Sequence, residues 1–115
     1  MRQRFAIGIL QTIFLESADD FIKNLDDKTR KKVFYNVRIA EKSNDPKLFK
    51  KLTDEIWEFR IRFSNKQIRL LAFWNKRKSE NTLVIATNGF IKKTQKTPKA
   101  DINKAKKIMS EYLKD

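Results

Sequence analysis

The chain has 115 residues and contains neither cysteine nor histidine. Without cysteine it has no disulfide framework and no thiolate metal site, which suits a reducing compartment such as the cytoplasm. Without histidine a zinc site is not expected, and the commonest general base is absent. No cluster of carboxylates suggests a calcium or magnesium site either. We therefore expect no metal and no other cofactor, and any acid–base chemistry must use lysine, arginine, carboxylate or tyrosine side chains.

Long apolar runs are also missing. No segment approaches 18 uncharged apolar residues, so a membrane-spanning helix is not expected. The first 15 residues faintly resemble a signal peptide, but they lack a small-residue cleavage site, and Gln11 and Thr12 interrupt the apolar run. We interpret this segment as a strand. With 40% apolar residues, the chain is expected to form one cytoplasmic domain, residues 1–115, with a modest core.

Acidic residues are scarce relative to basic ones, 14 against 27, for a net charge of +13. The excess is uneven, because residues 1–57 hold 12 basic and 9 acidic side chains whereas residues 58–115 hold 15 and 5. Such asymmetry indicates a nucleic acid, an acidic protein or an anionic lipid as partner. A lysine-rich solvated surface from an AT-rich genome is the alternative. The arginines interrupt apolar strands, which favours an anionic ligand.

The hydrophobic pattern predicts an α+β fold with the element order β-α-α-β-β-β-α. The expected elements are a strand at 4–14, helices at about 17–25 and 27–42, strands at 56–63, 67–75 and 82–91, and a last helix from Thr97-Pro98 onward. Helices grouped before a three-strand meander suggest an antiparallel sheet with the two N-terminal helices on one face and a C-terminal helix.

Several local signals fix details of this prediction. Asp26 or Asp27 is expected to cap the second helix, and Thr97 to cap the last one with Pro98 at its first position. Gly89 lies late in the last strand, where a bulge or bend is expected. Between the second helix and the meander we expect one packed turn formed by Leu48, Phe49 and Leu52.

The meander also predicts a cationic surface. In residues 56–63 the aromatic and apolar residues alternate with Glu58, Arg60 and Arg62, so the charged set shares one sheet face. Arg69 is a lone cation in an apolar strand, which is costly unless it pairs or reaches a wet cleft. If the strands pair as a meander, this face collects the three arginines and the lysines that follow the last strand. Such a surface needs an anionic ligand.

Three motifs in this half of the chain carry a family resemblance. They are W-E-F-R-I-R, an R-L-L strand about ten residues later, and G-F-I-K-K-T-Q-K-T-P followed by D-I-N-K-A-K. Together they resemble the HigB branch of the RelE/ParE toxin superfamily over residues 55–109. The resemblance implies a RelE-like microbial RNase-type fold and ribosome-dependent, metal-independent cleavage of mRNA in the A site. It also implies the ribosome and mRNA as partners, and neutralisation by a cognate helix-turn-helix antitoxin of the HigA type.

The resemblance also implies site residues. Arg60 and Arg69 match the strand residues that such toxins direct at the scissile phosphate, a task that suits the planar guanidinium fork. The C-terminal basic cluster, Lys93 and Lys96 with Lys92, supplies candidates for the proton donor or for a substrate clamp. Glu58 is a candidate base, and its alternative role is a structural salt bridge to Arg60 or Arg62. The predicted catalytic set is Arg60, Arg69, Lys93, Lys96 and Glu58.

Further residues are candidates for RNA contact. They are Lys50, Lys51, Arg62, Trp74, Phe90, Lys92 and Lys99. Because Phe73 and Trp74 face opposite sides of a strand, one belongs to the core and the other is free to stack on a base. Tyr112 lies too late in the last helix to replace the tyrosine or histidine that some members use at the scissile bond.

Two other functions remain open from the sequence. One is a ParE-like inhibitor of gyrase, which performs no cleavage, and the other is a non-enzymatic, phage-derived RNA-binding protein. The convergence of Arg60 and Arg69 with the lysine cluster favours cleavage, because a gyrase inhibitor needs no phosphate-clamping residues.

Overall fold

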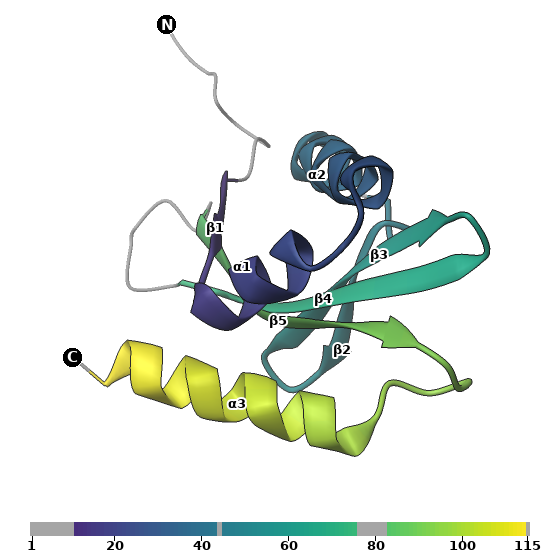
Figure 1. Ribbon diagram of the computed structural model, residues 1–115. Coiled ribbons are helices and arrows are strands. Elements are labelled where there is room, and N and C mark those ends of the chain that lie inside the picture. The colour runs from purple at the N-terminus through teal and green to yellow at the C-terminus, as the bar shows by residue number, and fades with distance from the viewer. Residues whose placement is uncertain (1–10, 44, 76–82, 115) are drawn as a thin grey trace, which may run out of the picture.

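The computed structural model of the chain describes residues 11–43, 45–75 and 83–114 (Figure 1). Its elements are β1 (Gln11–Phe14), α1 (Glu16–Lys23), α2 (Asp27–Lys42), β2 (Phe49–Thr53), β3 (Ile56–Phe63), β4 (Lys66–Trp74), β5 (Leu83–Lys92) and α3 (Lys99–Leu113). The predicted α+β class is confirmed, and the three strands of the meander lie within one residue of their expected bounds. The first predicted strand began at residue 4, and its part before residue 11 lies outside the described residues. None of the helices in the described ranges is long and apolar enough to cross a membrane.

The five strands form one mixed sheet in the order β1-β5-β4-β3-β2. Strands β2 to β5 pair antiparallel, whereas β1 pairs parallel with β5. Leu48 lies in a turn as predicted, but Phe49 and Leu52, expected in the same packed turn, belong to strand β2. The segment is extended because Phe49 stacks on the rings of Trp57 and Phe59, with centroids 5.0 and 4.3 Å apart. The structure therefore has a fourth antiparallel strand, which the short, lysine-rich sequence of β2 did not predict.

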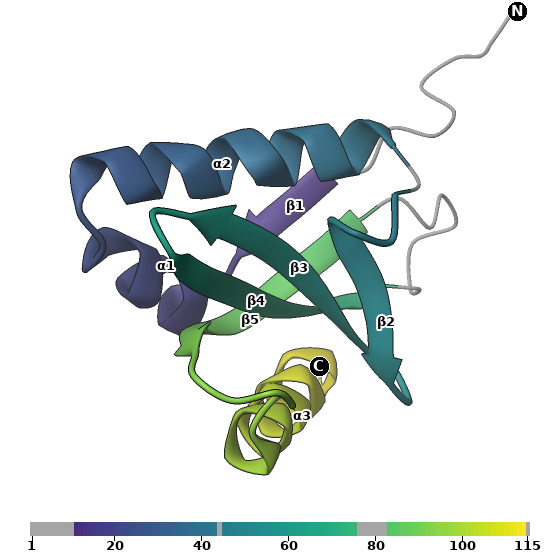
Figure 2. The ribbon, with the colours of Figure 1, turned by 90° about the vertical axis from the view of Figure 1, so that its right-hand side faces the viewer.

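Helices α1 and α2 cover one face of the sheet and form the larger core, as predicted (Figure 2). Apolar side chains at helical spacing, such as Ile22, Val33 and Val37, pack there against Phe59 and other inward-facing strand residues. Helix α2 begins as expected, because the Asp26 carboxylate accepts a hydrogen bond from the backbone N–H of Thr29 at 2.9 Å. This face provides most of the buried apolar surface.

Helix α3 packs on the opposite face and covers only part of it (Figure 2). Ala105 and Met109 pack on Ile56 and Leu71, and the ring of Tyr112 meets Phe73 edge-on. The ends of β3 and β4 near their connecting hairpin extend beyond the helix. Charged side chains occupy this uncovered part of the sheet.

The start of α3 differs from the prediction. Pro98 occupies the position before the helix, and no side chain caps the first turn. The Thr97 hydroxyl does not cap the helix, because it donates a hydrogen bond to the carboxylate of Glu58 on β3. A capping hydroxyl would accept a hydrogen bond from a backbone N–H, whereas this one donates to a buried carboxylate in a bond assisted by the acceptor's charge.

The irregularity in β5 also lies elsewhere than predicted. The register shifts between Leu71 and Ala72, which pair with Asn88 and Ala86, so Thr87 is the extra residue. Gly89 serves a different purpose, because it allows the ring of Phe21 in α1 to approach the strand closely. A Cβ at Gly89 would lie 2.8 Å from Cδ2 of Leu70 and nearer still to the Phe21 ring.

We therefore predict that Gly89→Ala lowers the free energy of unfolding by about 1–3 kcal/mol, because the added methyl group overpacks the contact with α1. Urea denaturation measures this change. In a Phe21→Leu background the methyl group has more room, so the same substitution should destabilise less. Equal losses in the two backgrounds would show that the contact with Phe21 does not explain the glycine.

Candidate functional site

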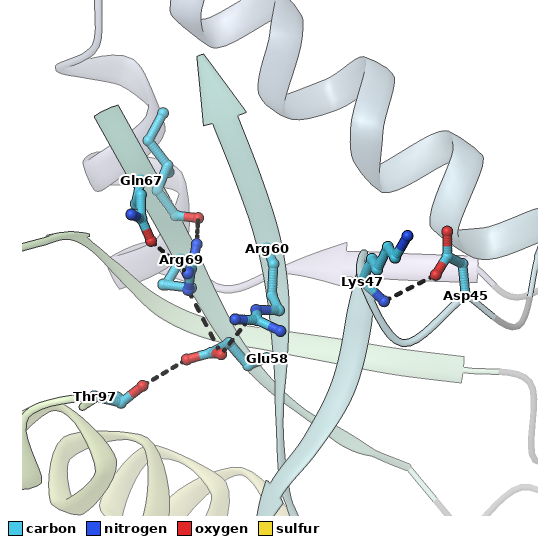
Figure 3. A network of polar contacts seen from close by, with 8 residues as sticks. Asp45, Lys47, Glu58, Arg60, Gln67, Arg69 and Thr97 are labelled. Carbon is cyan, nitrogen blue, oxygen red and sulfur yellow. Dashed lines mark hydrogen bonds and ion pairs between the residues drawn. The ribbon is translucent and has the colours of Figure 1, made fainter. Parts of the chain in front are cut away.

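Arg60 and Arg69 lie directly opposite each other on β3 and β4. Residues paired in an antiparallel ladder point to the same face, so both guanidinium groups project from the side of the sheet opposite to α2. Figure 3 shows them converging at the uncovered part of this face. The alternation in β3 predicted the face, and the pairing of the strands brings the two arginines together.

Glu58 lies beneath the two arginines with only 4% of its surface exposed. Its Oε1 atom is 3.5 Å from Nε of Arg69 and 3.7 Å from Nε of Arg60. Its Oε2 atom accepts a hydrogen bond from the Thr97 hydroxyl at 2.6 Å (Figure 3). Both carboxylate oxygens are thus engaged by the protein itself. This geometry favours the alternative role of a structural ion pair over the role of general base.

Arg69 is as deeply buried as Glu58, with 4% of its surface exposed. Its terminal nitrogens donate to the Gln67 side-chain oxygen at 3.0 Å and to the Ile68 carbonyl at 3.2 Å. Burial lowers the pKa of the Arg69 guanidinium, the charge of Glu58 acts against this, and Arg60 lowers it further. Arginine nevertheless stays protonated in proteins, so the site retains a desolvated positive charge.

The arginines border a hollow of about 260 Å³ at the protein surface. It is lined by Lys47, Arg60, Ile61, Arg62 and Arg69. Among the residues that the structure describes, its lining contains no carboxylate. Its volume is several times the roughly 30 Å³ that one water occupies in the liquid. The hollow therefore has the charge and the room for an anion such as a phosphate group.

Lys47 is a member of this lining that the sequence did not single out. Its backbone N–H donates to the Asp45 carboxylate at 2.9 Å, which holds it in the turn before β2 (Figure 3). The next residue, Leu48, accepts a hydrogen bond from the backbone N–H of Arg60 at 2.8 Å. Only the pairing of β2 with β3 brings Lys47 to the hollow. The sequence carried no signal for it beyond its charge.

Two larger hollows of the described structure have a different character. One of about 510 Å³ includes Asp54 and Glu55, and one of about 450 Å³ includes Glu16 and Asp20. Carboxylates in their linings disfavour an anionic ligand. Within the described ranges, no three or more carboxylates are grouped so that they could hold a metal ion.

Lys92 and Lys50 lie beside the arginine pair. Lys92 ends β5 opposite Gln67, and Lys50 on β2 lies opposite Glu58. Burial lowers the pKa of Lys92, and the charges of Arg69, Arg60 and Lys50 lower it further, while Glu58 opposes this. These cations therefore belong to one electrostatic site.

The other predicted lysines follow β5. Lys93 and Lys96 are exposed in the segment between β5 and α3, where the Lys96 carbonyl accepts a hydrogen bond from the Thr94 hydroxyl at 2.8 Å. Lys99 is the exposed first residue of α3. The segment is attached to the site at Thr97 through the hydrogen bond to Glu58. The sequence pattern did not indicate Thr97 as a site residue, because a threonine before a proline is typical of the start of a helix.

Two predicted RNA contacts do not reach the site. Trp74 is five residues from Arg69 on β4, and odd spacing in a strand places two side chains on opposite faces. Its ring packs against Phe49 and Trp57 in the core under α2. Lys51 pairs with Trp57 and so also belongs to that side of the sheet.

Phe90 lies on the face of the sheet that carries the site. It lies opposite Arg69 in the ladder between β4 and β5. Its ring packs against the small core under α3, so it forms the boundary between that core and the cationic surface.

A model of a protein family described as "Phage derived protein Gp49-like (DUF891)" matches residues 20–110. This range contains the second half of α1, all of α2, the whole of β2 to β5, and every residue of the site described above. No match was found among curated proteins.

Lys92→Met offers a test of the electrostatics of the site. Because burial and neighbouring cations lower the pKa of Lys92, its charge destabilises the fold at neutral pH, and the substitution should raise Tm. The folded-state pKa lies below the unfolded value of about 10.5, so the gain should be full below the folded pKa and should disappear as the pH rises towards 10.5.

Thermal denaturation between pH 7 and 10.5 measures the effect, with exposed Lys107→Met in α3 as the matched control. The control should leave Tm nearly unchanged. A fall in Tm on replacing Lys92 would contradict the assignment, because it would show that the ammonium group makes a net stabilising contact.

Proposed function

The chain belongs to the Gp49-like family of phage-derived proteins, a family of RelE/HigB-like toxins, and we propose that it is a HigB-like toxin that cleaves mRNA in the ribosomal A site. In this proposal it is an endoribonuclease and the toxin of a type II toxin–antitoxin pair. The observation that carries the proposal is the convergence of Arg60 and Arg69 above a buried carboxylate, beside a hollow lined by cations.

Cleavage by the ribose 2′-hydroxyl passes through a phosphorane with additional negative charge. Two guanidinium groups from adjacent strands of a rigid sheet match this charge, since each donates to phosphate oxygens through a planar fork. Arg69 is largely removed from water, and electrostatic stabilisation is stronger in such an environment. We assign Arg60 and Arg69 to the scissile phosphate.

Two protons must move in this step. In this proposal the proton of the attacking 2′-hydroxyl passes to solvent water, and a lysine supplies the proton that the leaving oxygen takes up. Lys92 is the proposed donor to the leaving 5′-oxygen, because it lies in the field of the arginine pair and its lowered pKa makes it a better acid. The exposed Lys93 and Lys96 are proposed to hold the flanking phosphates. Arg62 and Lys50 extend the cationic surface, and Lys47 joins them at the hollow.

The proposed partners follow from the same surface. A net charge of +13 favours association with the ribosome and its mRNA in the cytoplasm. A cognate antitoxin, expected to carry a helix-turn-helix domain of the HigA type, is proposed to neutralise the toxin. No metal ion or other cofactor is part of this proposal.

Arg60→Gln tests the proposal most directly, because the Arg60 side chain is one-third exposed and can be removed without leaving a large cavity. We expect a loss of about 100-fold or more in cleavage of mRNA on purified ribosomes, the scale seen when a transition-state donor is removed. Mapping of mRNA 5′ ends measures the cuts. Arg38→Gln, an exposed arginine on α2 across the sheet, is the matched control and should cleave as wild type does.

Arg69→Lys provides a second variant in which the positive charge is retained and only the fork is lost. It should also cleave poorly while staying folded. Growth arrest by wild type with intact mRNA and damaged DNA would overturn the proposal in favour of gyrase inhibition. If expression of wild type is harmless and it binds RNA without cutting it, the protein is a non-enzymatic RNA-binding member.

A further inference from the structure

We propose that Thr97 is a positioning residue, whose hydroxyl fixes the Glu58 carboxylate so that it holds both arginines at once and anchors the lysine segment to them. The inference deepens the proposed function and rests on it for its catalytic consequence. The positioning role itself depends only on the contacts among Glu58, Arg60, Arg69 and Thr97.

The two oxygens of the Glu58 carboxylate have different partners. Oε1 of Glu58 lies 3.5 and 3.7 Å from the Nε atoms of the two arginines, almost equidistant, and Oε2 faces Thr97 (Figure 3). Without the hydroxyl, Oε2 would be a buried and unpaired oxygen, which is unfavourable. The carboxylate would then gain most by turning towards one arginine as a bidentate pair.

Such a turn would change what the arginines present to a ligand. A bidentate pair occupies two donors of one guanidinium and draws that group down towards Glu58. The other arginine would lose its share of the carboxylate. The hydroxyl of Thr97 therefore keeps both guanidinium groups in place at the lining of the hollow.

Thr97 also anchors the chain segment that connects β5 to α3. Residues 93–98 connect β5 to α3 and carry the exposed Lys93 and Lys96. One end of the segment is fixed by the pairing of Lys92 with Gln67, and the other by the hydrogen bond from Thr97 to Glu58. Both anchors lie at the arginine site, so the lysines are held beside it.

The Thr97 hydroxyl forms no hydrogen bond with the first turn of α3. A threonine at a helix start stabilises it by about 0.5–2 kcal/mol when it caps the first turn, yet no side chain caps α3. The hydroxyl contacts a residue 39 positions away in the sequence. The hydroxyl thus contacts a buried charge on a distant strand and makes no contact that stabilises the helix after it.

The test compares Thr97→Val with Thr97→Ser. Valine has the same shape without the hydroxyl, and serine keeps the hydroxyl. We expect Thr97→Val to lower kcat for ribosome-dependent cleavage by about 10-fold with little change in KM, because misplacement of catalytic groups by a fraction of an ångström lowers rates on this scale. Thr97→Ser should stay within about twofold of wild type, since it preserves the geometry.

A double-variant comparison separates positioning from a general loss of stability. If Thr97 acts through Glu58, the loss caused by Thr97→Val should largely vanish in a Glu58→Gln background. Additive losses in the two variants would overturn the inference, as would a Thr97→Ser variant as impaired as Thr97→Val.

The last measurement needs no ribosome. The ¹H–¹⁵N resonances of the Nε–H groups of Arg60 and Arg69 report their contact with the carboxylate, and Thr97→Val should shift both while Thr97→Ser leaves them in place. Unchanged resonances in the valine variant would overturn the inference whatever the activity. Shifted resonances in a protein that never cuts mRNA would uphold the positioning role and refute the nuclease proposal.

Discussion

The burial of one carboxylate beneath two guanidinium groups is the interaction on which the rest of the site depends. Arg69 and Glu58 are both almost inaccessible to water, and either charge alone would be costly in that position. Each therefore offsets the desolvation of the other. A single carboxylate cannot neutralise Arg69, Arg60 and the nearby Lys92 together, so the assembled site keeps a net positive charge. That surplus is what an anionic ligand would neutralise.

The fold separates stability from ligand binding by using the two faces of one sheet. Helices α1 and α2 bury the larger core on one face, whereas α3 covers only part of the other (Figure 1). The cations project from the remaining part. The opposite face of the same strands carries buried residues such as Phe59, Ile61 and Leu70. A sheet anchored in this way holds charged groups at fixed positions despite their mutual repulsion. Lys92 illustrates the compromise, because its surroundings disfavour the charge that its proposed role requires.

The chain belongs to a toxin-like, phage-derived family, and the cationic site lies within the residues that the family model matches. Much of the fold was predictable because it depends on local patterns. Alternation in β3 placed Glu58, Arg60 and Arg62 on one face, and the apolar stripe of α2 marked its buried side. The prediction failed where long-range packing decided the outcome, as in β2, which is extended because Phe49 stacks on β3, and at Gly89, which accommodates the ring of Phe21.

The sequence by itself determined the excess of positive charge, the class of the fold and the face to which each strand residue points, because composition and periodicity are properties of neighbouring residues. Only the tertiary structure decided which side chains meet. Strand register set Arg60 opposite Arg69, the pairing of β2 brought Lys47 to the hollow, and a contact across 39 residues joined Thr97 to Glu58. Register and chain crossings are fixed by the packing of the whole core, and no local spacing encodes them.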